Sequence, residues 1–134
     1  MRSHSLRELS IEGGESILEK LPRFDFYDIK RVTRFTWSRD PSVDPQKPIS
    51  DLDMAVEYTD PVDQSLTSIR LRCSCVRLLR LPELGGDFFV NEIEIEDISH
   101  DQIEDVRYRV KDFGESGFEI LCKAIEISFN KSLT

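Results

Sequence analysis

The sequence has no long apolar run, and this absence excludes several classes of protein. Nowhere in its 134 residues do apolar side chains approach the stretch of about 20 that a transmembrane helix needs. The first residues include Arg2 and Arg7 but no apolar segment of the kind found in secretory signal peptides. We therefore expect a soluble chain that is not exported and that resides in the cytoplasm.

Cysteine and histidine are both scarce, with three Cys and two His in the whole chain. An odd number of cysteines does not make a disulfide framework, and a structural zinc site usually takes four Cys or His ligands at short spacings. We expect Cys73, Cys75 and Cys122 to be buried, reduced thiols, with Cys73 and Cys75 on the same side of one strand. We predict no bound metal and no other cofactor.

Positively charged residues are outnumbered by negatively charged ones, 18 to 26, which gives a formal net charge of −8 at pH 7. Such a chain repels phosphate backbones, whereas nucleic-acid binding normally relies on clustered Lys and Arg. We therefore expect no nucleic-acid partner. Acidity alone promotes solubility, but it also complements the surface of a basic protein.

Catalytic motifs are missing as well. His100 beside Asp101 has the chemistry of a general base, but no motif for a nucleophile accompanies it. The pairs Gly13-Gly14 and Gly85-Gly86 lack the lysine of a phosphate-binding loop. We predict a protein that is not an enzyme and has no catalytic residues.

Three carboxylates alternate along one segment and suggest a cation site at first sight. Asp51, Asp53 and Glu57 fall on one face of a predicted strand. Successive residues on that face are about 7 Å apart, so these carboxylates do not close on one ion without help from a neighbouring strand. A solvated strand face is the simpler interpretation.

What the sequence does contain is alternation typical of antiparallel β structure. Apolar residues make up 39% of the chain, enough for one core in a chain of this size. In residues 51–58 every second residue is apolar, and a second strand through Cys73 turns Arg70 and Arg72 outward. The sequence thus predicts a mainly β or α+β fold, an antiparallel sheet curved into a sandwich or a half-open barrel.

The predicted domain spans the whole chain, residues 1–134. Residues 1–22 form a helical or frayed N-terminal appendage, with a short helix at Glu15–Leu21 that covers an edge or one end of the sheet. Residues 23–134 form the antiparallel β core. Its predicted loop at Ser38–Ser50 contains three prolines.

Two further segments carry complementary charges. Phe88–Ile98 has Glu92, Glu94 and Glu96 on one face, and residues 106–111 alternate apolar residues with Arg107, Arg109 and Lys111. An antiparallel pair with Glu96 opposite Arg107 and Glu94 opposite Arg109 also sets Ile95 against Tyr108 and Ile93 against Val110. Each such pair contributes roughly 0.2–1 kcal/mol, so both faces favour this register.

The apolar phase shifts in two predicted strands. One shift lies between Phe26 and Ile29, and the other lies within the last strand, Phe118–Phe129, after Cys122. A bulge or bend explains a shift of this kind.

Several of these segments together resemble one family. The segments are Phe26-Tyr-Asp-Ile29, the strand with Leu71 and Cys73, Asn91-x-Ile93-x-Ile95, and the closing run from Gly117 to Ile127. The chain is similar here to small β-rich bacterial immunity proteins, which protect a cell from its own polymorphic toxins. The resemblance implies a non-catalytic inhibitor that binds a toxin protein, and a basic toxin would match the acidic chain.

Two other functions stay open. The eight Phe residues could line a pocket for a small molecule, which would make the chain a small-ligand binder. An exposed sheet edge could instead pair with a second copy in a homodimer of purely structural role. Recovery of a co-purifying protein, a bound small molecule or a dimer distinguishes the three.

Overall fold

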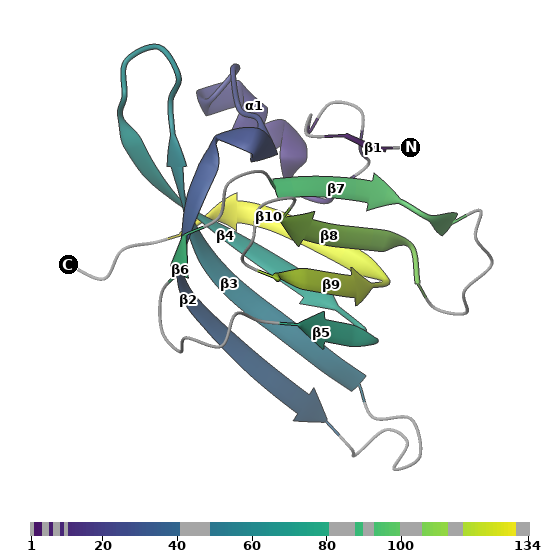
Figure 1. Cartoon of the computed structure of the whole chain (residues 1–134). Coiled ribbons are helices and arrows are strands. Elements are labelled where there is room, and N and C mark those ends of the chain that lie inside the picture. The colour runs from purple at the N-terminus through teal and green to yellow at the C-terminus, as the bar shows by residue number, and fades with distance from the viewer. Residues whose placement is uncertain are drawn as a thin grey trace.

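The chain folds into two antiparallel β sheets that pack face to face, with one short α helix beside them (Figure 1). The computed structural model describes residues 2–3, 6, 9, 11–40, 49–80, 88–89, 93–99, 106–112 and 117–130. The elements are β1 (Arg2–Ser3), α1 (Gly14–Lys20), the 3₁₀ turn η1 (Phe26–Asp28), β2 (Ile29–Asp40), β3 (Ile49–Thr59), β4 (Leu66–Ser74), β5 (Leu78–Arg80), β6 (Phe88–Phe89), β7 (Ile93–Asp97), β8 (Tyr108–Asp112), β9 (Glu119–Cys122) and β10 (Ala124–Phe129). One sheet has the order β1-β7-β8-β9-β5 and the other β10-β4-β3-β2-β6. Neither sheet closes on itself, so the predicted antiparallel fold takes the form of a sandwich and not of a barrel.

Alternating apolar residues hold the two sheets together. On β3, Leu52, Met54, Val56 and Tyr58 are all buried, as the sequence predicted. Burying each large apolar side chain contributes roughly 1.5–3 kcal/mol. Side chains from both sheets meet at the centre of the core, namely Ile29, Val32, Met54, Val56, Leu71, Ile93, Val110 and Phe118.

The outer face of β3 and β4 carries the two rows of opposite charge that the sequence predicted. Arg70 Nε donates to Asp53 Oδ1 at 2.9 Å, and Arg72 Nη2 lies 3.4 Å from Asp51 Oδ2. These ion pairs fix one strand against the other and leave the charges on this face largely compensated.

The segments rich in Glu and in Arg and Lys do pair antiparallel, but two residues away from the predicted register. β7 and β8 set Glu94 opposite Lys111 and Glu96 opposite Arg109, whereas the sequence predicted Arg109 and Arg107 as their partners. Both alternations have a period of two, so a slide by two residues keeps each acid opposite a base. The pattern therefore specified the faces of the strands and left the absolute register open.

The apolar pairs move by the same step. Ile95 faces Val110 rather than Tyr108, and Ile93 faces Asp112 rather than Val110. The other side of β8 pairs with β9, which sets Val110 opposite Ile120. The third predicted acid of the row, Glu92, lies outside the described residues.

Two bends carry the chain between the sheets, and both correct a predicted continuous strand. The predicted last strand divides at Lys123, with β9 in one sheet and β10 in the other. The N–H of Lys123 donates to the carbonyl of Ser74 at 3.0 Å, which ties this corner to the end of β4. Cys75 has φ +54° and lies beyond β4, so Cys73 and Cys75 do not share a face of one strand. In the predicted last strand, the shift in apolar phase after Cys122 therefore marks a change of sheet and not a bulge.

The other phase shift has a different cause. Residues 26–28 form η1, and the Asp25 side chain accepts a hydrogen bond from the N–H of Tyr27 at 2.9 Å at the start of this turn. The predicted strand over these residues is therefore wrong, because the phase shift marks a 3₁₀ turn. Register shifts between β2 and β3 do occur, but they lie further along the chain, between Ile29 and Arg31 and between Val32 and Arg34. Strand β2 reaches Asp40, so the predicted loop at 38–50 is shorter than expected, and residues 41–48 lie outside the described part.

The predicted strand Phe88–Ile98 is also divided between the sheets. Its first part, β6, pairs with β2, and its second part, β7, pairs with β8 in the opposite sheet. A single predicted strand thus links the two layers. Residues 90–92 between them are not described.

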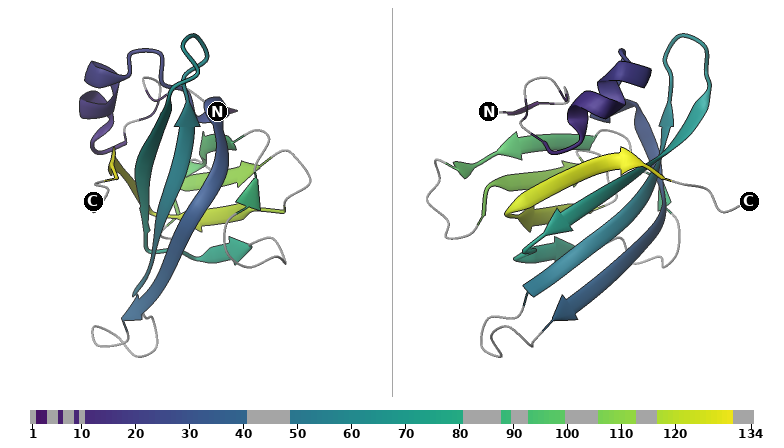
Figure 2. Two further views of the ribbon diagram at one scale, coloured as in Figure 1. Left: turned by 90° about the vertical axis from the view of Figure 1, so that its left-hand side faces the viewer. Right: turned by 180° about the vertical axis from the view of Figure 1, so that it is seen from behind.

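The N-terminal segment lies along one edge of each sheet. β1 pairs with β7, and the carbonyl of Glu12 accepts a hydrogen bond from the N–H of Ile127 on β10 at 2.8 Å. Helix α1 then lies against β10 (Figure 2), with Ile17 fully buried. Its bounds differ from the predicted helix by one residue at each end. Within the described residues, no helix has the length and apolar character needed to cross a bilayer.

Candidate docking surface

The three carboxylates considered as a cation site are each engaged by a different arginine. Besides the pairs of Asp51 and Asp53 with β4, Glu57 Oε1 lies 3.3 Å from Arg31 Nη1 on β2. Hydrogen bonding from Arg70 keeps the pKa of Asp53 below its usual range. In the part of the chain that the structure describes, no group of His, Cys, Asp and Glu side chains is arranged to hold a metal.

The cysteines come together across the sandwich. Cys73 on β4 and Cys122 on β9 are buried in contact with each other, and Cys75 is half-buried. The hydrogen bond with Cys73, and next the burial of the site, raise the pKa of the Cys122 thiol. Because the thiolate is the reactive form, Cys122 is an inert core residue and not a nucleophile.

The remaining sequence candidates do not form a site in the described structure. His100, Asp101, Gly85 and Gly86 lie outside the described residues. Gly13 and Gly14 lie where the chain enters α1, packed against β10 and Leu6 respectively. At Gly13 and Gly14 the absence of a side chain allows this close approach of the backbone.

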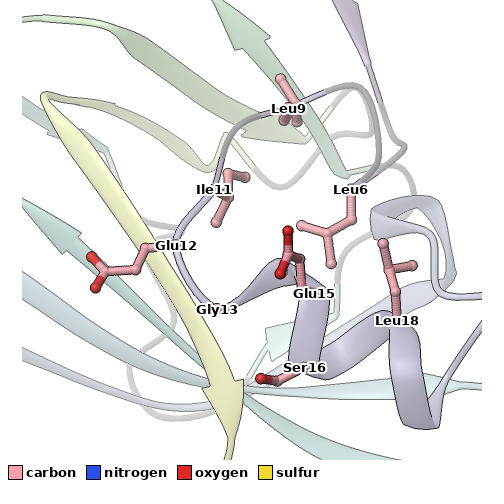
Figure 3. Close-up of a pocket in the computed structure, with 9 residues that line it drawn as sticks. Leu6, Leu9, Ile11, Glu12, Gly13, Glu15, Ser16 and Leu18 are labelled. Atoms are coloured by element: carbon pink, nitrogen blue, oxygen red, sulfur yellow. The ribbon is translucent and has the colours of Figure 1, made fainter.

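A hollow of about 780 Å³ lies between the N-terminal segment and α1 (Figure 3). Leu6, Ile11 and Leu18 supply apolar walls, and Glu15 points between them, whereas Glu12 points away past β10. Small-molecule sites usually have several convergent polar groups in a mainly apolar cavity. A single carboxylate beside backbone gives little basis for recognising a ligand.

A different surface is formed by the end of the sandwich at which β2 begins. There the hairpin that joins β3 to β4 extends beyond the sheets (Figure 1). The pairing of Ile29 with Tyr58 places η1 next to the end of β3 from which this hairpin starts. Three large apolar side chains are exposed at this end: Tyr27 is 40% exposed, Val62 68% and Leu66 66%. We call this surface, together with Asp28, the hairpin-end surface.

The hairpin is held in place by Asp60. This carboxylate accepts hydrogen bonds from Arg23 Nη2 at 3.0 Å and from the N–H groups of Val62 and Asp63 at 2.8 and 3.2 Å. The bond from the N–H of Val62 contributes most to keeping the pKa of Asp60 below its usual range. Asp63 in turn accepts a hydrogen bond from the N–H of Ser65 at 2.8 Å. The exposed apolar residues therefore project from an ordered turn.

Asp28 is in the opposite electrostatic situation. Burial, and next the nearby charges of Asp25 and Asp60, raise the pKa of Asp28, and Lys30 offsets this only in part. No described residue donates a hydrogen bond to its carboxylate. Among the described residues, no cation forms an ion pair with the carboxylate of Asp28.

Tyr58 lies beneath the same surface. Its side chain is fully buried against Phe24, and its hydroxyl has no hydrogen-bond partner among the described residues. Burial, followed by the charges of Asp60 and Asp28, raises the pKa of Tyr58 to about 12. An unsatisfied buried hydroxyl costs roughly 1–3 kcal/mol and is uncommon in native proteins.

The alternation in residues 51–58 places Tyr58 on the apolar face of its strand, and Tyr58 is buried as predicted. The available signal was Val62, an apolar residue within a polar turn. Only the fold brings η1 next to that turn.

Comparison with protein families gives a match over most of the chain. The family described as immunity protein PIM8 matches residues 17–128. The chain belongs to this family. The matched range begins within α1, includes β2 to β9 and β10 up to residue 128, and includes all residues of the hairpin-end surface. The membership agrees with the resemblance seen in the sequence. No curated protein and no solved structure matches the chain.

Proposed function

We propose that this chain neutralises a toxin by binding it stoichiometrically, without catalysis, in the cytoplasm. The observation that carries the proposal is the match to an immunity-protein family over residues 17–128, which includes almost the whole sandwich. Immunity proteins act by binding a partner toxin. The partner of this chain is therefore a protein, and its recognition requires a surface and not a reactive centre.

The polar residues support the same proposal. On the outer faces of the sheets, arginines pair with the carboxylates of Asp51, Asp53 and Glu119, and the thiol of Cys122 is buried with a raised pKa. A net charge of −8 favours rapid encounter with a basic partner, because complementary potentials raise association rates. We infer a toxin domain with a basic binding face.

The test is a rescue screen. Toxin domains encoded by the host genome are expressed one at a time from an inducible promoter, with and without this chain. We expect one toxin that stops growth alone and does not stop growth when the chain is co-expressed. The purified pair should form a 1:1 complex by size-exclusion chromatography with light scattering.

Titration of toxin activity separates binding from catalysis. If the chain neutralises by binding, activity should fall linearly and reach its minimum near one chain per toxin molecule. Complete loss at far lower ratios would indicate enzymatic inactivation and contradict the proposal. Failure to rescue cells from any toxin, with a bound small molecule or a stable homodimer instead, would contradict it as well.

A further inference from the structure

The hairpin-end surface combines exposed apolar area with an ordered backbone. Val62 and Leu66 are about two-thirds exposed, although the turn that carries them is fixed by the hydrogen bonds of Asp60 and Asp63. A flexible loop would lose entropy on binding, whereas an ordered turn has already lost it on folding. This surface is therefore preorganised for contact with another molecule.

Two polar groups at the same place have no partner in the described structure. The carboxylate of Asp28 receives no hydrogen bond and is repelled by Asp25 and Asp60, and the buried hydroxyl of Tyr58 lies in the field of these carboxylates. A cation between η1 and the hairpin would relieve the repulsion. Its N–H groups would also donate hydrogen bonds to the carboxylate of Asp28.

The outer faces of the two sheets lack this combination. On the outer face of β3 and β4 the carboxylates are paired with arginines. On the outer face of the opposite sheet, Glu119 is bonded by Arg109 at 2.6 Å and approached by Arg80 at 3.6 Å. The exposed Trp37 stands near the far end of β2, remote from the uncompensated carboxylates (Figure 1).

We infer that the hairpin-end surface is where the toxin docks, with a Lys or Arg of the toxin on Asp28 and its apolar neighbours on Tyr27, Val62 and Leu66. This inference rests on the proposed function and adds the location of the interface. An apolar rim around a charge pair excludes water, which strengthens the pair. The occupant is thus a basic, partly apolar protein face.

The experiment uses the toxin domain recovered in the rescue screen and the full chain. Asp28→Asn and Leu66→Ser test the charge and the apolar contact. The matched controls are Glu126→Gln, an exposed acid on β10, and Trp37→Ser, an exposed apolar residue on β2. All four changes are at partly or fully exposed positions, and thermal melts verify that each variant folds.

Isothermal titration calorimetry at low and high salt gives the result. We expect Asp28→Asn to weaken binding about tenfold or more and to reduce the salt dependence, because one ion pair is lost. Leu66→Ser should also weaken binding about tenfold, with the salt dependence unchanged. The two controls should change the dissociation constant less than about threefold.

The outcomes separate this inference from the proposed function. If the wild-type chain binds the toxin but both hairpin-end variants bind as well as the wild type, the docking surface is wrong and the function stands. The same conclusion follows if the controls weaken binding as much as the hairpin-end variants do. A wild-type chain that binds none of the toxins overturns both proposals.

Discussion

Gly13 allows a quantitative test of how the N-terminal segment is attached to the sandwich. It has φ +88°, and a Cβ atom built on it would overlap the carbonyl oxygen of Ile127 on β10. Gly117 has a similar φ of +78°, but a Cβ atom there meets nothing within 4 Å. Replacing each glycine with alanine therefore imposes the same backbone strain, and only at Gly13 does a steric clash come in addition.

The difference between the two variants isolates the cost of the clash. A left-handed backbone conformation destabilises a non-glycine residue by about 1–2 kcal/mol. Alanine also lowers the conformational entropy of the unfolded chain, which stabilises the folded state by about 0.4–1 kcal/mol and offsets part of this loss. We expect Gly117→Ala to lower the free energy of unfolding by about 1 kcal/mol. In Gly13→Ala the segment must move off β10, which weakens the hydrogen bond between Glu12 and Ile127 and the packing of Ile17. A hydrogen bond is worth about 1 kcal/mol and a partly lost apolar contact about as much again, so the total is about 3 kcal/mol.

Equilibrium unfolding in urea, followed by circular dichroism, measures both variants against the wild-type chain. A loss of 3 kcal/mol is a large part of the 5–15 kcal/mol that stabilises a typical domain, so the midpoint should move clearly. Equal losses for the two variants would refute the reasoning, because they would show that residue 13 does not press on β10. A larger loss at Gly117 would refute it too.

Three other predictions concern single side chains. Hydrogen bonds keep the pKa of Asp60 below its ordinary value of 3.8, so its contribution to stability is present above that pH and is lost as the pH falls through the folded-state pKa. Asp60→Asn should therefore make the free energy of unfolding less dependent on pH in the acid range. An unchanged pH dependence would contradict this. A thiol reagent should label half-buried Cys75 first and Cys122 only on unfolding, as counted by mass spectrometry; rapid labelling of Cys122 would exclude its buried position. Glu119→Gln should lower the free energy of unfolding by about 1 kcal/mol in thermal melts, because Arg80 and Arg109 both contact this carboxylate. Glu126→Gln, at an exposed position, is the control and should have little effect. Equal effects of the two variants would argue against the pairing.

Much of the fold could be predicted because burial imposes a period of two on a strand with one dry face. The alternation from Leu52 to Tyr58 identified the core face of β3 correctly, and Arg70 and Arg72 were correctly placed on the wet face opposite the carboxylates. The short helix was predicted to within one residue at each end. These features depend on neighbours in sequence or on one adjacent strand.

The candidate docking surface could not be predicted in the same way. From the sequence, Tyr58 is expected to be an ordinary core residue. Its neighbours in space, Phe24 and Asp28, come from a segment about thirty positions earlier in the chain, so the alternation around Tyr58 does not predict them. The hydrogen bonding of the Tyr58 hydroxyl depends on how η1 packs against the β3–β4 hairpin. Local patterns contain no information on that packing.

The sequence by itself determined which residues of β3 face the core and which strands carry complementary charge. The tertiary structure decided the absolute register of β7 on β8 and the change of sheet at Lys123. The physical reason is that alternating apolar and charged residues repeat every two positions, so registers two apart satisfy the same local interactions. Only the packing of one sheet on the other, with the N-terminal segment along their edges, distinguishes these registers.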